Sequence, residues 1–416
     1  MRPHRLMTST GRTLIVVMLL TLLGAHLVVA QGEIPPTYQD LPLLLRGEIG
    51  ARWTGMGGAC MALVDDGSAA YWNPAGLGKI RRIEILGGMN WLDNTIDTEY
   101  YDNPNTSSVS RTRFEDLAFS YPFPTYRGSF VLTGSVYRQT SYEQYLNRWA
   151  LVNTDTLRDI ETRDVALTAW SGAFAVQLSQ SLFLGAEAHF NTGDMKMKET
   201  YYPWGACPEP GGIFEQTSSL GGYGGKLGLV YLPHPMASMG MVLKLPERIS
   251  VRGSEVITSN HDPCEDLYQS IRYDIDLPYS FGFGLGFTPD NFMIGFDLVH
   301  TDWRQLHFPG RVRDPATGQY YYDATTDLRA GVEYSIPIQN PVRVWAGYAY
   351  VPMELNLFII EKNRSRFSLG AGILVEESLT IDFTWQRTTS ERKHLESFYS
   401  EKQEIDRAIV TLAFRF

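Results

Sequence analysis

Apolar side chains recur at every second position in many short runs of this chain. From Phe292 to Leu298, apolar residues alternate with Met293, Gly295 and Asp297, and runs with the same period cover 184–190, 328–336 and 379–385. Successive side chains of a β-strand point to opposite faces of a sheet, so this period predicts strands. In each run the charged residues fall on the face opposite the wholly apolar one.

The alternating runs predict about 14 strands, an even number typical of bacterial outer-membrane barrels. Their spans are 81–92, 113–122, 127–140, 163–178, 181–193, 219–233, 236–253, 270–288, 290–303, 323–337, 340–352, 364–375, 378–388 and 404–416. Short turns such as Ser179-Gln180 and Pro289-Asp290 alternate with long polar connections. The long ones are 93–112, 141–162, 194–218, 254–269, 304–322, 353–363 and 389–403. This rhythm favours a transmembrane antiparallel β-barrel over a soluble sandwich.

The two segments before the first strand differ from the rest of the chain. Residues 1–30 combine basic residues with the apolar run Leu14–Val29, which predicts a signal peptide cleaved before Gln31. The alternative is a membrane anchor, but the run is shorter than the roughly 20 residues that a spanning helix needs. Residues 31–80 do not alternate and are predicted to lie outside the wall, which leaves 81–416 for the barrel.

Composition agrees with an exported barrel. Aromatic residues make up 12% of the chain and 38 residues are glycine, which suits aromatic girdles and a wall that needs small side chains. The formal net charge is −10, so binding to nucleic acid, which requires clustered Lys and Arg, is not expected. The predicted location is the bacterial outer membrane, with its lipid as a partner.

The last strand carries apolar residues at alternate positions and ends on an aromatic residue. Leu412, Phe414 and Phe416 resemble the C-terminal signal that barrel-assembly machinery recognises. We therefore expect that machinery to be a further partner.

Catalytic and metal-binding motifs are not predicted. The run Phe281–Gly286 has glycine at every second position, unlike the G-x-G-x-x-G dinucleotide fingerprint. Inward-facing glycines there would leave room for a plug or a passage. His261–Asp266 is interpreted as a solvated loop rather than a metal site. We expect no enzyme activity and no cofactor.

Cysteine is scarce, and two of the three cysteines fall on neighbouring long connections. Cys207 and Cys264 lie in polar, proline-flanked segments, where export would permit a disulfide between them. Cys60 would then stay unpaired. The alternative, two further free thiols, is left open.

A motif near the N-terminus resembles a known family. It comprises Arg52–Ala59, then Ala62 with Asp65-Asp66, then Tyr71–Leu77. These residues are similar to the N-terminal motif of the FadL/TodX family of outer-membrane transporters and of its PorV-like relatives. The resemblance implies a 14-stranded barrel with residues 31–80 folded inside as a hatch. The hatch residues it marks are Gly55, Gly57, Gly58, Asp65, Asp66, Asn73, Pro74 and Ala75.

The resemblance implies transport of long-chain fatty acids or similar hydrophobic small molecules. The alternative is a PorV-like role, in which the protein binds or shuttles cargo of a secretion system and has secretion proteins as partners. A general diffusion porin is disfavoured because a hatch would fill the lumen. In the family the substrate leaves through an opening in the wall, for which Gly134 and Gly172 are candidates.

Overall fold

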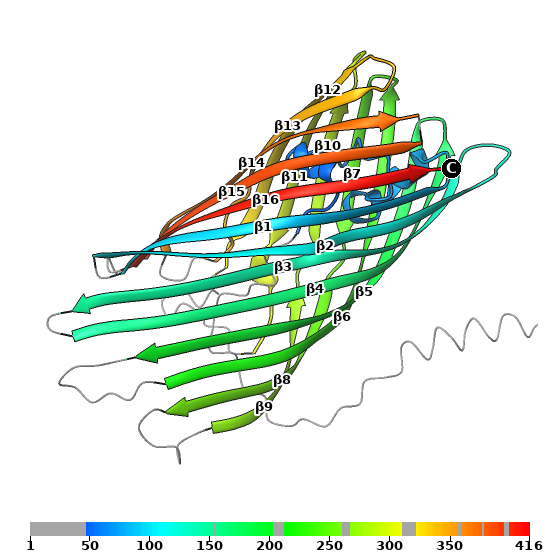
Figure 1. The fold of residues 1–416 in the computed structure, drawn as a ribbon. Helices are drawn as coiled ribbons and strands as arrows, with labels where there is room; N and C mark the ends of the chain where they lie inside the picture. Colours follow the sequence, from blue (N-terminus) through cyan, green and yellow to red (C-terminus); the bar gives the residue numbers. More distant parts are fainter. Residues whose placement is uncertain are drawn as a thin grey trace, which may run out of the picture. The chain divides into compact units, whose positions relative to one another are not determined.

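A computed structural model describes residues 47–100, 102–152, 155–202, 212–259, 267–309, 322–355, 359–376, 378–394 and 399–416. Most of them form one antiparallel sheet that closes on itself, because β5 pairs with both β4 and β6 (Figure 1). The strands are β1 (Glu84–Tyr100), β2 (Asn103–Phe123), β3 (Phe130–Val152), β4 (Asp155–Ser179), β5 (Leu182–Tyr202), β6 (Gly212–His234), β7 (Ala237–Lys244), β8 (Glu247–Ser259), β9 (Leu267–Leu277), β10 (Ser280–Phe287), β11 (Phe292–Asp302), β12 (Ala324–Ile336), β13 (Val342–Tyr350), β14 (Ile359–Val375), β15 (Leu379–His394) and β16 (Tyr399–Arg415).

Two of the predicted strands are interrupted at the same level of the wall. β7 and β8 follow each other along one edge of β6, and β9 and β10 continue the next strand, so the barrel has fourteen strands. The breaks fall at Pro246 and Pro278, and proline cannot donate the backbone hydrogen bond that a sheet requires. The prediction of continuous strands over 236–253 and 270–288 is therefore wrong at these two points.

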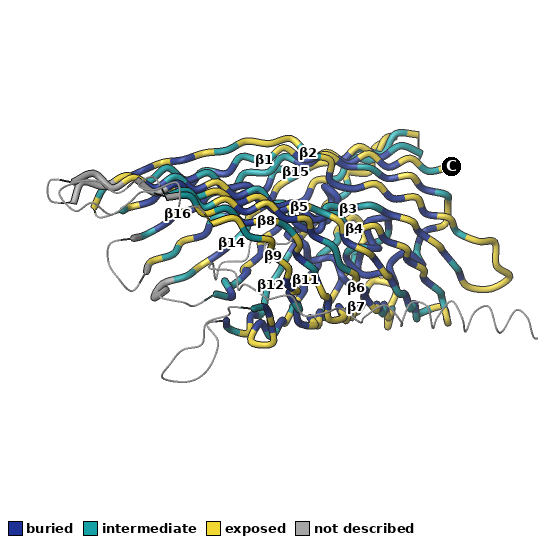
Figure 2. Tube along the Cα trace, turned by 90° about the horizontal axis from the view of Figure 1, so that it is seen from below, coloured by how far each residue is buried: buried dark blue, intermediate teal, exposed yellow. Residues whose placement is uncertain are grey.

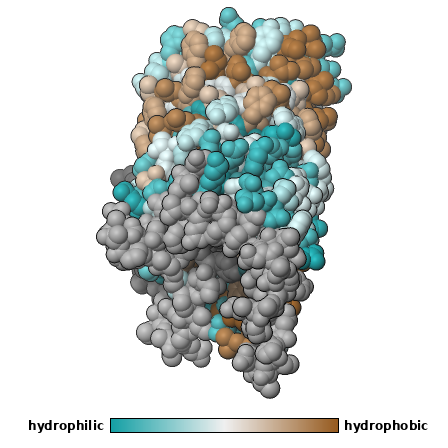
Figure 3. Space-filling model, turned by 90° about the vertical axis from the view of Figure 1, so that its left-hand side faces the viewer, coloured by the Kyte–Doolittle hydropathy of each residue, from teal (hydrophilic) through white to brown (hydrophobic). Residues whose placement is uncertain are grey.

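The outer surface of the barrel has an apolar belt between two rows of exposed aromatic residues. One row includes Trp91, Trp170, Phe190 and Tyr223, and the other includes Phe123, Phe287, Phe292, Phe414 and Phe416. On the face shown in Figure 3, hydrophobic residues gather in a band with hydrophilic residues beside it. Such girdles mark the two interfaces of a membrane.

Several strands continue well past the girdle at the end with the long connections, here called the outer end. β1 to β6 have 17 to 25 residues, whereas crossing a membrane takes about 9–11. The predicted connections 93–112, 141–162 and 194–218 are thus largely strand. The sequence conceals these strand ends because, beyond the lipid, the outward-facing residues are polar and the inward-facing residues are apolar, the reverse of the pattern within the membrane. In β8 and β9, Arg248 and Arg272 face outward while Ile249 and Ile271 are buried inside.

Residues 47–80, here called the lumen segment, are enclosed by the strands (Figure 1), along whose traces buried and exposed residues alternate (Figure 2). They contain the short helices α2 (Ala51–Gly55) and α3 (Ala69–Trp72) and the 3₁₀ helix η2 (Pro74–Lys79). Nearly all of these residues are buried. The remainder of the predicted N-terminal segments, 1–46, lies outside the described residues.

Glycines of the wall allow the backbone of the lumen segment to approach closely. A Cβ at Gly331 or Gly347 would overlap the backbone of Met56 or Gly57, and one at Gly240 would overlap that of Met61. The glycines of 281–286 lie equally close to the side chains of Met61 and Leu63. The prediction that these glycines face inward and leave room for a plug is confirmed.

Candidate functional site

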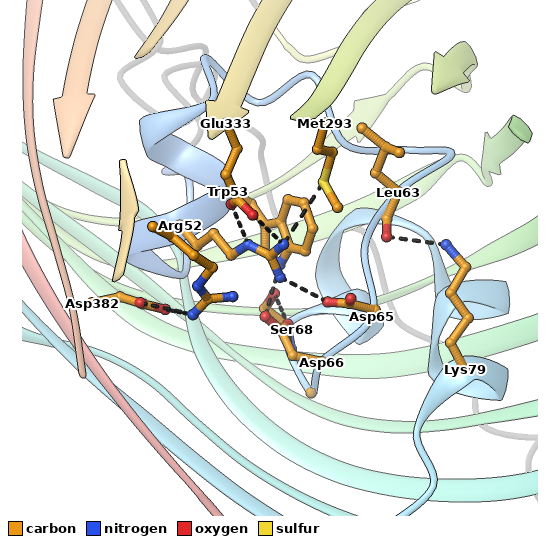
Figure 4. A network of polar contacts seen from close by, with 12 residues as sticks. Arg52, Trp53, Leu63, Asp65, Asp66, Ser68, Lys79, Met293, Glu333 and Asp382 are labelled. Atoms are coloured by element: carbon orange, nitrogen blue, oxygen red, sulfur yellow. Dashed lines mark hydrogen bonds and ion pairs between the residues drawn. The ribbon is translucent and has the colours of Figure 1, made fainter. Parts of the chain in front are cut away.

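The lumen segment is fastened to the wall by a buried ion pair (Figure 4). Arg52 of α2 donates from Nε and Nη2 to the two carboxylate oxygens of Glu333 on β12, at 2.6 and 2.8 Å. Its third nitrogen, Nη1, lies 3.1 Å from Asp65 Oδ1. Burial opposes the charge, yet these two carboxylates raise the pKa of Arg52 above its ordinary value. The pair therefore joins the segment to the barrel.

Asp65 and Asp66 hold the turn that precedes α3. Asp66 accepts hydrogen bonds from Trp53 Nε1 at 2.8 Å and from the backbone N–H of Ser68 at 3.0 Å. Burial, followed by the neighbouring Asp65, raises the pKa of Asp66. Burial acts on Asp65 too, but Arg52 and Lys79 outweigh it and lower the pKa of Asp65. Both residues therefore shape the segment.

Asn73 links three parts of the molecule. Its Oδ1 accepts from the backbone N–H of Ala75 and so caps η2, which begins at Pro74. Its Nδ2 donates to the backbone oxygens of Met61 at 2.6 Å and of Leu229 on β6 at 3.1 Å. The turn at Asn73-Pro74 is therefore also a point of attachment to the wall.

The glycines of the motif have distinct roles. Gly57 and Gly58 adopt φ values of 68° and 73°, a left-handed conformation that glycine tolerates best. A Cβ at Gly55 would overlap the indole of Trp345. Together with Asp66, Asn73, Pro74 and Ala75, these residues form one buried unit inside the barrel, and the half-exposed Asp65 lies at its edge.

Two cavities lie on the outer side of the lumen segment, and both are lined by Gly47 and Glu48. One, of about 150 Å³, is bordered by Tyr71, Trp72 and Trp303. The other, of about 90 Å³, is lined by six arginines and three glutamates. The arginines are Arg138, Arg163, Arg364, Arg366, Arg392 and Arg407. This excess of positive charge stands inside a chain whose net charge is −10.

Glu48 lies at the boundary of the two cavities. It accepts from Arg366 Nη1 and, at 2.9 Å, from Gln386 Nε2, and Arg329 lies 3.9 Å away. Burial alone would raise the pKa of Glu48, but Arg366, Arg329 and Arg407 together lower it. The carboxylate thus stays charged among the arginines.

Arg138 is one of the six arginines of this cavity. Its Nε is buried and has no hydrogen-bond partner within the part of the chain that the structure describes. A buried donor without a partner is costly, so an anion within reach of this nitrogen would be stabilised.

Next to these cavities, the inner wall of the outer half is apolar. Inward side chains of β4, β5, β6, β8 and β9 form one cluster with residues of the connection after β11. Its members are Val165, Leu167, Met195, Met197, Leu220, Ile249, Val251, Ile271, Tyr273, Ile275, Leu277, Trp303, Leu306, Phe308 and Tyr322. The wall part of this set, from Val165 to Leu277, is here called the apolar groove. Barrel lumens are usually polar, so the groove suits a hydrophobic molecule.

The sequence gives no warning of Glu48, Arg138 or the groove as parts of a site. Inward-facing arginines at alternate positions, such as Arg364 and Arg366, are the one signal that could have indicated the positive cavity. The groove is hidden because its strands lie beyond the membrane, where inward residues are the apolar ones.

The remaining predicted residues have mixed outcomes. Leu412, Phe414 and Phe416 face outward at the end of the wall, and their recognition by assembly machinery stays a prediction. Gly134 and Gly172 pair with each other in unbroken ladders, so they do not form an opening. Cys207, Cys264 and His261–Asp266 lie outside the described residues, whereas Cys60 is a buried free thiol.

Among the residues that the structure describes, no group of three or more His, Cys, Asp or Glu side chains could hold a metal ion. None of the described helices is long and apolar enough to cross a membrane.

Comparison with known proteins identifies the fold through structure alone. No protein-family model matches the chain, and no curated protein matches it in sequence. Among solved structures, a Pseudomonas aeruginosa FadL homologue is similar with a TM-score of 0.66 at 15% identity, covering 88% of this chain and 98% of that one. The P. putida toluene transporter TodX gives 0.67 at 14%, covering 88% and 98%. The CymD monoaromatic hydrocarbon channel gives 0.59 at 16%, covering 88% and 97%. The chain is therefore an outer-membrane β-barrel with the FadL/TodX fold.

Proposed function

We propose that the protein carries hydrophobic small molecules with an acidic group, such as long-chain fatty acids, across the outer membrane, and that the lumen segment is the hatch of this path. The observation that carries the proposal is the contact between two unlike surfaces in the lumen. Leu355 lines the arginine-rich cavity and also packs against the apolar cluster. An acid with an apolar tail would find a partner for each of its ends.

The energetics favour such a substrate. Each CH₂ removed from water contributes about 0.8 kcal/mol, so a tail of 16 carbons gains on the order of 12 kcal/mol in an apolar site. Hydrogen bonds from arginine to a carboxylate are strong and directional. Binding is thus easy and release is the difficult step, which a shift of the hatch would assist by breaking the site.

The fold neighbours support transport as the class of function. Their names describe a toluene transporter and a monoaromatic hydrocarbon channel, both for apolar compounds. The arginines around Glu48 favour an acid as the substrate of the present chain over a neutral hydrocarbon.

A direct test is uptake of labelled oleate by a bacterial strain that lacks its own fatty-acid transporter. Expression of this chain should restore uptake, and Arg138→Ala should reduce it several-fold without changing the amount of folded barrel. Arg248→Ala, on the outer surface, is the matched control and should behave as the wild type. If the wild-type chain rescues uptake of neither oleate nor any other apolar compound, the proposal fails.

A second function, a PorV-like role in protein secretion, is favoured by one observation. β3, β4 and β6, with 23, 25 and 23 residues, project past the girdle and present a charged outer face that lipid cannot cover. Proximity labelling in the native host distinguishes the two functions. Recovery of translocon components and secreted cargo would favour secretion.

A further inference from the structure

Within the part of the chain that the structure describes, the wall of the barrel has a gap at its outer end, beside β9. β11, β12 and β13 are only 11, 13 and 9 residues long and stop near the girdle. Within the described residues, β9 pairs with β8 on one edge, and its other edge is bonded only at Asp276. There the backbone of Asp276 exchanges two hydrogen bonds with His307, at 2.8 and 3.0 Å.

The segment that reaches this gap turns into the lumen instead of extending the wall. After β11 the chain forms the 3₁₀ turn η4 (Trp303–Gln305) and continues to Phe308. Leu306 and Phe308 are buried at 0% and 1% exposure, and Trp303 is buried as well. All three side chains pack in the apolar cluster. We call residues 303–308 the strap.

The strap occupies the space that an apolar tail would need. Trp303 belongs to the apolar cluster and also borders the 150 Å³ cavity, so this cavity reaches the strap. A cavity of about 150 Å³ holds a molecule of the size of benzene. A chain of sixteen carbons is much larger, so it fits only if the strap leaves the groove.

Several polar contacts hold the strap. Besides the two bonds with Asp276, Trp303 Nε1 donates to Thr325 Oγ1 at 3.0 Å, and Arg304 and Gln305 donate to the carboxylate of Asp302, the residue just before the strap. A substrate tail would replace the apolar contacts that the strap gives up, because both bury the same wall residues.

Building on the proposed function, we infer that the apolar groove is the binding site for the apolar tail of the substrate, and that the strap fills this groove until the substrate displaces it. The ligand class is an unbranched acyl chain or a tail of similar width. The strap also keeps water from the groove in the empty protein.

A disulfide lock tests the inference. Asp276 and His307 form a hydrogen-bonded antiparallel pair, whose Cα atoms lie about 5.5 Å apart, within the range for a disulfide. Asp276→Cys with His307→Cys should form this bond in a background in which Cys207 and Cys264 are replaced by serine. Ser250→Cys with Asp274→Cys is the matched control, since these residues pair between β8 and β9 and do not involve the strap.

The locked protein should bind radiolabelled oleate at least ten-fold more weakly than the same protein after reduction. The control disulfide should leave binding unchanged. Binding within two-fold in the locked and reduced states would overturn the inference while leaving the proposed function intact.

A measurement without substrate decides the matter if oleate does not bind to any variant. Ile249 is fully buried beneath the strap in the cluster. Ile249→Cys should react with N-ethylmaleimide in the unlocked protein, and at least ten-fold more slowly in the locked one. Equal rates would overturn the strap's role, whereas a slowed rate together with absent oleate binding would reject only the proposed substrate.

Discussion

Arg52 and Glu333 are 281 positions apart in the chain, yet they form a bidentate ion pair inside the barrel. The side chains are almost completely buried, at 8% and 3% exposure. Removing one partner of such a pair leaves an uncompensated charge, which typically costs about 3–5 kcal/mol. This pair is therefore a principal attachment of the lumen segment to the wall.

We expect Glu333→Gln to loosen the lumen segment without unfolding the barrel. The freed Arg52 should make the segment susceptible to trypsin, and the heat-modified band in SDS gels should persist. The exposed pair Arg248–Asp276 supplies the control, because surface ion pairs contribute about 0–1 kcal/mol. If Glu333→Gln and Arg248→Gln resist trypsin equally, the attachment has been assigned to the wrong pair.

Glycine in the wall has opposite consequences at two positions. A Cβ at Gly347 would overlap the backbone of Gly57, whereas one at Gly134 would meet nothing within 4 Å. We expect Gly347→Ala to destabilise the folded state by about 1–3 kcal/mol through overpacking, and Gly134→Ala to be neutral. Thermal unfolding of both variants in detergent provides the measurement. If Gly347→Ala unfolds at the same temperature as the wild type, the lumen segment does not pack closely against the wall at this position.

Acid should weaken the outer end of the lumen segment through Glu48. The pKa of this carboxyl is lowered below its ordinary 4.5 in the folded state, so its ionisation stabilises the fold fully at pH values above 4.5. The contribution is lost as the pH falls through the lowered value. Hydrogen exchange of residues 47–55 should therefore accelerate below pH 4.5 in the wild type.

The Glu48→Gln variant separates this effect from general acid unfolding. It should exchange faster already at pH 7, because Arg366 and Arg329 lose their partner, and it should show a smaller additional change on acidification. An identical pH profile in both proteins would assign the effect to another group.

We expect the attachment at Asn73 to affect release of the substrate rather than folding of the barrel. Asn73→Ala with Pro74→Ala removes the bonds to Met61 and Leu229 and the start of η2. We expect the barrel to stay heat-resistant in detergent while substrate release, or capture of cargo, is impaired. Loss of the folded barrel itself would show that the motif is required for folding.

The strands were predictable where lipid imposes a pattern on them. Between the girdles one face must be apolar, so runs such as Phe292–Leu298 stand out. Beyond Trp91 and Trp170 the outward face meets water and the inward face becomes apolar, so the same strands were interpreted as loops. Pro246 and Pro278 are the sequence signals that indicate the two breaks, whereas the alternating pattern alone predicts continuous strands there.

The motif around Gly57 and Asn73 located the lumen segment, but not its contacts. Its partners, such as Glu333 and Gly347, come from strands that follow hundreds of positions later. Only the closure of the barrel brings these residues together. The alternation of apolar and polar residues predicts which side chains face inward, but not which of them are in contact. The arginine-lined cavity and the groove depend on the same closure.

The most direct test of the account is a cryo-EM structure of the protein in lipid nanodiscs with oleate. We predict density inside the barrel that runs from the arginine-lined cavity beside Arg138 into the apolar groove, with an acid recovered by mass spectrometry of the same sample. Oleate confined to the outer, lipid-facing surface, with the cavity and the groove unchanged, would contradict the central claim that this lumen binds hydrophobic acids.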